Sequence, residues 1–133
     1  MGKKKAREPE YSLNVFHHYD EKTKRNVVVF LVQTTRIFVS FRYEILLEDL
    51  VSDGSIDLKI VGLHVPELLM PQMGPAAGSR YYEGLNGLFT VNVSKQDKTL
   101  NSFRIEISPD RVDIKQKPRE PFIILSNEPV SLS

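Results

Sequence analysis

The stretch NVVVFLVQTTRIFVSFRYEILL, residues 26–47, decides the fold because it is the most apolar part of the chain. Its first part, residues 27–32, is an unbroken run of valine, phenylalanine and leucine. Such residues favour a pleated, buried surface, so the run predicts a strand that is covered on both faces. Because burial of one such side chain contributes roughly 1.5 to 3 kcal/mol, we expect this stretch to be the main source of stability.

The second part of the stretch changes from a continuous to an alternating pattern. Apolar residues occupy every second position from Ile37 to Ile45, and most of the positions between them are polar. This period of two predicts a strand with one face in water. The join Gln33-Thr34-Thr35 lacks the Gly, Asn or Pro of a tight turn, so a hairpin and a single bent strand both remain open, and we favour the hairpin. The longest uncharged run of the stretch, residues 26–35, is well short of the roughly 20 apolar residues that a membrane-spanning helix needs.

The rest of the chain alternates in short segments that are separated by turn signals such as Asp53-Gly54 and Ser108-Pro109-Asp110. Residues 45–51 fit either a short helix or the end of a strand. Further strands are predicted at residues 10–16, 56–60, 89–93, 103–107, 112–114 and 122–125. We therefore expect an all-β, single-domain antiparallel β-sandwich of about eight strands, Ig-like or jelly-roll-like in shape, with a barrel as the alternative.

Residues 62–87 break all periodicity and are predicted to form one long irregular loop. They contain three of the eight prolines and five of the seven glycines. Connections in compact domains usually run about 4 to 6 residues, so a loop of this length is either functional or disordered. Its apolar residues argue against disorder, and a crossover of this length between two sheets is the reason to favour the sandwich over the barrel.

The whole chain, 133 residues and 15.2 kDa, suits one domain with a substantial core. It contains no cysteine, which removes disulfides and thiolate metal sites and fits a reducing compartment. The basic start is followed by Glu8-Pro9-Glu10 and not by an apolar segment, so we expect no signal peptide and a cytoplasmic location. We divide the chain into a flexible basic arm at residues 1–9, the sandwich domain at 10–126 and a loose tail at 127–133.

The net charge of +1 is unevenly distributed along the chain. The arm carries Lys3, Lys4, Lys5 and Arg7, and these residues are the candidates for binding a polyanion, either nucleic acid or an acidic membrane surface. Residues 8–133 hold the remaining 14 basic side chains against all 17 acidic ones. A folded part with this mild negative balance gives no indication of a nucleic-acid-binding face.

Histidines supply one low-ranking alternative, a metal-dependent enzyme. His17 and His18 stand beside Asp20 and Glu21, and the third ligand of a catalytic metal would be His64. Adjacent residues on a strand point to opposite faces, so His17 and His18 could meet one ion only where the chain turns. We therefore expect no metal site.

Other catalytic patterns are missing from the sequence. No serine stands in a Gly-x-Ser-x-Gly elbow, and the glycine pair at residues 84–87 lacks the lysine and hydroxyl residue of a phosphate-binding loop. We expect a protein that is not an enzyme and that needs no cofactor.

Two clusters inside residues 62–87 point instead to binding. Arg80, Tyr81 and Tyr82 are of the types that are enriched in binding hot spots. Met70 and Met73 belong to an apolar segment of the kind that forms adaptable contacts. The sequence therefore favours a non-enzymatic binding or assembly module, in which this loop contacts a protein partner or a second copy of the chain.

Overall fold

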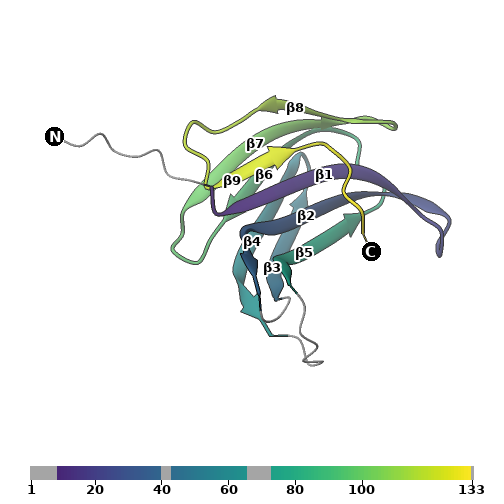
Figure 1. The fold of residues 1–133 in the computed structure, drawn as a ribbon. Coiled ribbons are helices and arrows are strands. Elements are labelled where there is room, and N and C mark those ends of the chain that lie inside the picture. The colour runs from purple at the N-terminus through teal and green to yellow at the C-terminus, as the bar shows by residue number, and fades with distance from the viewer. Residues whose placement is uncertain (1–8, 40–42, 66–72, 133) are drawn as a thin grey trace.

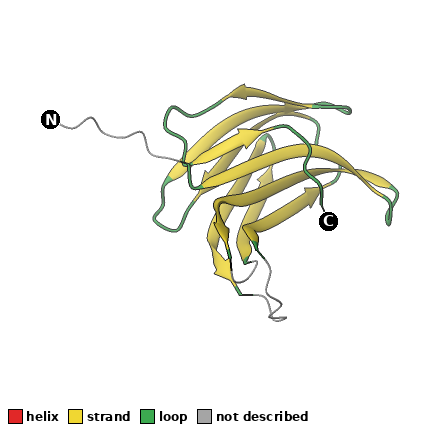
Figure 2. Cartoon of the chain, in the orientation of Figure 1, coloured by secondary structure: helices red, strands yellow, loops and turns green. Residues whose placement is uncertain are grey.

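The structure, a computed structural model, describes residues 9–39, 43–65 and 73–132. The described residues form strands and no helix (Figures 1 and 2). No helix that could cross a membrane occurs in this part of the chain. The nine strands are β1 (Tyr11–Asp20), β2 (Arg25–Phe38), β3 (Glu44–Ser52), β4 (Ser55–His64), β5 (Gly74–Tyr82), β6 (Gly87–Ser94), β7 (Leu100–Ile107), β8 (Val112–Gln116) and β9 (Ile123–Ser126).

All nine strands belong to one sheet, in the order β8-β7-β6-β4-β3-β5-β2-β1-β9, which curls until it nearly closes into a barrel. The expected all-β fold is confirmed, but the expected antiparallel two-sheet sandwich is not. Five neighbouring pairs are antiparallel, whereas β1 with β9, β4 with β6 and β3 with β5 run parallel. The sheet is mixed because β5, β6 and β9 each pair in parallel with an earlier strand that is not their immediate neighbour in sequence.

The sheet narrows sharply between β3 and β5. Only one residue pair, Glu44 opposite Ala77, joins these strands. We call β8-β7-β6-β4-β3 the β3 half and β5-β2-β1-β9 the β5 half. At the joint, the two backbones approach so closely that a Cβ atom on Gly78 would overlap the carbonyl oxygen of Ile45.

The main core lies between the two halves, and β2 contributes to it with one face. Val28, Phe30 and Val32 point into this core. The opposite face of β2 carries a second apolar cluster, which is formed by Phe16, Val27, Val29 and Leu31. The prediction that this run is buried on both faces is therefore confirmed.

The second apolar cluster is covered by the end of the chain. Residues 127–132 form no strand, but the partly buried Val130 and Leu132 pack against this cluster, and the segment crosses the outer side of β1 (Figure 1). Asn14 Nδ2 donates a hydrogen bond to the carbonyl oxygen of Glu128 at 3.0 Å. The C-terminal segment thus acts as a strap across β1 and β2.

The hairpin that we favoured at Gln33-Thr34-Thr35 is wrong. β2 continues through these residues to Phe38 as one strand, and its register with β5 shifts between Gln33 and Ile37. Thr34 makes this irregularity possible, because its hydroxyl donates to the carbonyl of Arg36 at 2.8 Å and accepts from the amide of Ala76 at 2.9 Å. A side chain here replaces the ladder bonds that the irregularity removes.

The single irregular loop expected at residues 62–87 is also wrong. β4 extends to His64, and residues 74–82 form β5, which pairs with β2. The beginning of β5 reads Gly-Pro-Ala-Ala-Gly, a composition that hides a strand because it offers no alternation of large apolar residues. Small residues are required here because β3 passes so close to Gly78.

Candidate functional site

Four strand ends meet at one end of the molecule, which we call the tip (Figure 1). The end of β2 pairs with the start of β5 at Phe38 and Gly74, and the start of β3 pairs with the end of β4 at Glu44 and His64. The rings of Phe38 and Tyr43 connect the two pairs, with their centres 4.8 Å apart.

The tip exposes large apolar side chains. Val39 is 76% exposed, Met73 70% and Ile37 60%, while Leu63 and Val65 are exposed by almost half. Single exposed apolar residues are ordinary, but several of them at neighbouring strand ends make this end of the molecule a candidate interaction site. Arg36 lies with its guanidinium carbon 5.2 Å from the centre of the Phe38 ring and adds a cation to the tip.

The alternating pattern of residues 37–45 did not predict the exposure of the side chains at the tip. It predicted a strand that would bury Ile37 and Val39. Ile37 is still paired with Pro75, but after the register shift in β2 it is Phe38 that packs against the core, and Ile37 is exposed. Val39 follows the end of β2. Residue periodicity carries no signal for the register shift or for the end of the strand. Of the predicted partner-binding residues, Met73 lies in the tip, and Met70 lies outside the described residues.

The structure separates the three neighbouring residues of the predicted Arg-Tyr-Tyr cluster. Tyr81 faces outward and is 55% exposed. Arg80 and Tyr82 point to the other face, where both bind Asp49 of β3: Arg80 Nε lies 3.2 Å from one carboxylate oxygen and the Tyr82 hydroxyl lies 2.6 Å from the other. These two residues connect the halves of the sheet next to the narrow joint.

This contact shifts the pKa of both partners away from the neutral range. The hydrogen bond from Tyr82, with the bond and charge of Arg80, holds the pKa of Asp49 below its usual 3.8. Burial, followed by the hydrogen bond to Asp49 and the negative charge of that carboxylate, raises the pKa of Tyr82 above its usual 10.0. Both shifts favour the ionised carboxylate with the neutral phenol, which is a stable bridge and not an acid–base pair poised near neutral pH.

The three histidines lie apart. His17 Nε2 is 2.7 Å from the carbonyl oxygen of Ser108, which fixes it beside the turn after β7, while His18 is exposed on the other face of β1. His64 ends β4, with three strands between it and β1. No group of three or more His, Asp or Glu residues with metal-binding geometry occurs among residues 9–39, 43–65 and 73–132.

A depression of about 510 Å³ lies on the outer face of the β3 half. A polar ladder crosses its floor: Asn92 Nδ2 donates to Asp57 at 2.8 Å, and the Ser102 hydroxyl donates to Asn92 Oδ1 at 2.7 Å. Glu48 and Lys59 line the depression as well. Because the amide is satisfied at both ends, the ladder stabilises the sheet and leaves no activated nucleophile or base.

The predicted polyanion-binding residues Lys3, Lys4, Lys5 and Arg7 lie outside the described residues. Comparison with protein-family models, with curated proteins and with solved structures finds no match to this chain. The surfaces of the described residues therefore provide the basis for a functional proposal.

Proposed function

We propose that the protein is a non-enzymatic binding or assembly module that docks through its tip. The observation that carries the proposal is the exposure of Ile37, Val39, Leu63, Val65 and Met73 on the ends of adjacent strands. Their removal from water would favour association by roughly 25 cal/mol for each Å² of apolar surface. Association must offset several kcal/mol of lost freedom, so the whole cluster has to take part.

A second copy of the chain is the partner that we favour. Homodimer interfaces are more apolar than transient interfaces, and a two-fold contact buries the same patch on both subunits. The tip suits this because its five exposed apolar residues can lie against their own equivalents. A different protein with an apolar groove is the alternative partner.

The test compares the mass in solution of the full chain with that of the double variant Val39→Ser, Met73→Ser. We expect the wild-type protein to sediment and scatter light as a dimer at micromolar concentration, and the variant as a monomer. The control is Leu88→Ser, because Leu88 is 52% exposed but lies in β6 next to the turn at Gly54, away from the tip. A monomeric wild-type protein at 100 µM, a concentration about a hundredfold above a dissociation constant of roughly 1 µM, would refute the self-docking form of the proposal.

A separate variant tests the predicted role of the tyrosines. Tyr81→Ala removes an exposed ring without disturbing the bridge at Asp49, whereas substitution of Tyr82 would break that bridge. If Tyr81 belongs to the docking surface, its removal should weaken dimerisation. An unchanged dimer would limit the surface to the tip.

A further inference from the structure

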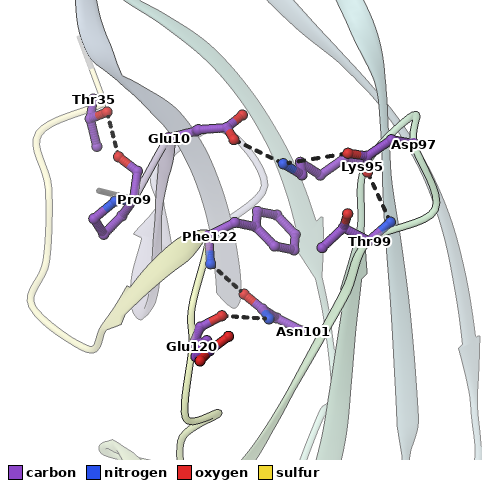
Figure 3. A network of polar contacts seen from close by, with 9 residues as sticks. All are labelled: Pro9, Glu10, Thr35, Lys95, Asp97, Thr99, Asn101, Glu120 and Phe122. Carbon is purple, nitrogen blue, oxygen red and sulfur yellow. Dashed lines mark hydrogen bonds and ion pairs between the residues drawn. The ribbon is translucent and has the colours of Figure 1, made fainter. Parts of the chain in front are cut away.

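The asparagine side chains of this protein differ in how firmly the fold holds them. Four of the six have their side-chain amide in a hydrogen bond: Asn14, Asn92, Asn101 and Asn127. Asn101 shows such a restraint clearly, because it is buried, accepts the amide proton of Phe122 at 2.8 Å and donates to the carbonyl of Glu120 (Figure 3). Hydrogen bonds of this kind hold the side chain in one orientation.

The other two asparagines, Asn26 and Asn86, have free side chains. Both are exposed, and neither side chain has a hydrogen-bond partner among residues 9–39, 43–65 and 73–132. Asn26 lies in β2 and is followed by the β-branched Val27. Asn86 lies in the loop between β5 and β6 and is followed by Gly87. Asn86 therefore combines a free side chain with a neighbour that has no Cβ atom.

The loop of residues 83–86 leaves open space around Asn86. Gly84 and Gly87 have a left-handed backbone, with φ of 74° and 107°, and no atom of the described residues lies within 4 Å of a Cβ added to either. Leu85 packs against the main core and anchors the loop. Gly87 is the first residue of β6, and its pair with Ile107 ends the ladder of β6 with β7. Because the ends of a strand open more easily than its centre, the amide nitrogen of Gly87 becomes available without disruption of the core.

We propose that Asn86 is a site of spontaneous deamidation. The backbone nitrogen of Gly87 attacks Cγ of Asn86, and the bond from Cγ to Nδ2 breaks. The side-chain nitrogen leaves as ammonia, which carries the proton that the backbone amide loses. Water then opens the resulting five-membered succinimide at one of its two carbonyl carbons. One opening gives aspartate at position 86, and the other gives isoaspartate, in which the chain continues through the former side-chain carbon.

Sequence and fold both place Asn86 ahead of the other asparagines. Asparagine is one of the thermolabile residue types. Ring closure brings the next backbone nitrogen against Cγ, and glycine allows the backbone angles that this requires. After Asn26, the branched side chain of Val27 hinders the same approach. Asn92 would also have to give up its hydrogen bonds, which its amide makes to neighbouring strands at 2.8 and 2.7 Å.

The product alters the connection between the two halves of the sheet, since the loop of residues 83–86 leads from β5 to β6. Asn86 lines a depression of about 380 Å³ together with the turn at Asp53 and Gly54. Deamidation therefore adds a second carboxylate to a depression that already holds the one of Asp53. Isoaspartate also lengthens the backbone by one methylene directly before β6, so Gly87 can no longer keep its place opposite Ile107.

The test incubates the full chain at pH 8 and 37 °C and follows each asparagine by mass spectrometry after digestion with trypsin. Trypsin releases residues 81–95 as one peptide, which contains both Asn86 and Asn92, and residues 26–36 as another, which contains Asn26. We expect deamidation at Asn86 to be at least about tenfold faster than at the other two, because only Asn86 is followed by glycine. Incubation in ¹⁸O-labelled water should place one heavy oxygen in the product, since water opens the ring. A sample that is digested without incubation corrects for reaction during digestion.

The same rates measured in urea separate the effect of the fold from that of the sequence. Unfolding should accelerate the reaction at Asn92, which loses its hydrogen bonds, far more than at Asn86, which has none to lose. If unfolding accelerates both sites equally, the fold protects Asn86 and the proposal is overturned.

Two variants complete the experiment. Asn86→Gln should abolish most of the acidic form that accumulates on anion exchange, because the longer side chain would have to close a six-membered ring. Asn26→Gln is the matched control at the other exposed, unbonded asparagine and should leave that accumulation unchanged. Equal rates at Asn86 and Asn26 in the folded chain, or undiminished accumulation in Asn86→Gln, would overturn the proposal. Neither variant alters the tip, so the outcome is independent of the dimerisation experiment.

Discussion

Gly78 is the residue at which the two halves of the sheet come closest. It lies in β5 with ordinary extended backbone. Glycine is needed here because it has no side chain, and not because it allows an unusual φ. The atom that a Cβ would meet is the carbonyl oxygen of Ile45, which belongs to the backbone of β3 and cannot rotate away. A single methyl group here would push the joint apart.

We therefore expect Gly78→Ala to lower the free energy of unfolding by about 1 to 3 kcal/mol, the usual cost of overpacking. Urea denaturation followed by circular dichroism measures it. Gly74→Ala is the matched control in the same strand, because no atom of the described residues lies within 4 Å of its added Cβ. A wild-type midpoint for Gly78→Ala would mean that β3 and β5 are further apart than described.

The strap of residues 127–132 explains how β2 can be apolar on both faces. The face that carries Val29 and Leu31 would be in water without Val130 and Leu132. The strap is also tied to the far edge of the sheet, since Asn127 Nδ2 donates to the carbonyl of Val112 in β8 at 2.7 Å. It thus holds β9, β1 and β8 together at the seam where the sheet nearly closes.

Replacing the two covering residues, Val130→Ser with Leu132→Ser, should uncover the second apolar cluster. We expect the free energy of unfolding to fall by roughly 1 to 3 kcal/mol, less than for two fully buried side chains because both are partly exposed. The readouts are thermal denaturation and increased fluorescence of an apolar dye. Stability and dye binding equal to those of wild type would show that the strap does not cover the cluster in solution.

How far the sequence predicts these elements depends on the kind of signal. The run at residues 27–32 predicted its own two-sided burial, and Asp53-Gly54 predicted the turn between β3 and β4, where Gly54 has a φ of 72°. β5 was not predicted because its first residues are small and show no apolar alternation. They are small because β3 passes close to Gly78. Tertiary contacts determine which strands pair in parallel and where β2 ends. The periodicity of apolar residues carries no information about such contacts, so neither feature could be predicted.

For the candidate sites, residue types alone were an incomplete guide. Arg80 and Tyr82 have the composition of a binding hot spot, yet both contact Asp49 across the sheet.

Across the whole molecule, the contacts of Asp49 make the connection between the halves sensitive to acid. Its pKa lies below 3.8 in the folded chain, chiefly because of the hydrogen bond from Tyr82. A carboxyl group with a lowered folded pKa contributes stability above its unfolded pKa, and that stability is lost as the pH falls through the folded value. The two halves should therefore be held together less strongly below about pH 4.

Tyr82→Phe tests this because it removes the main cause of the shift and keeps the ring that packs on Phe30 at 5.4 Å. We expect the variant to be less stable than wild type at pH 6, with a smaller further loss between pH 5 and pH 3. The measurement is urea denaturation across that range, with the exposed Tyr19→Phe as control. Parallel stability profiles for wild type and Tyr82→Phe would contradict the assignment.

The single pair between β3 and β5 has a consequence for how the protein must be made. The chain passes between the halves four times, because β1, β2, β5 and β9 belong to one and β3, β4, β6, β7 and β8 to the other. Neither half is a continuous segment of the chain, and the half that contains β1 is complete only when β9, the last strand, has been synthesised. A chain cut at any one position between two strands would therefore leave at least one half without all of its strands.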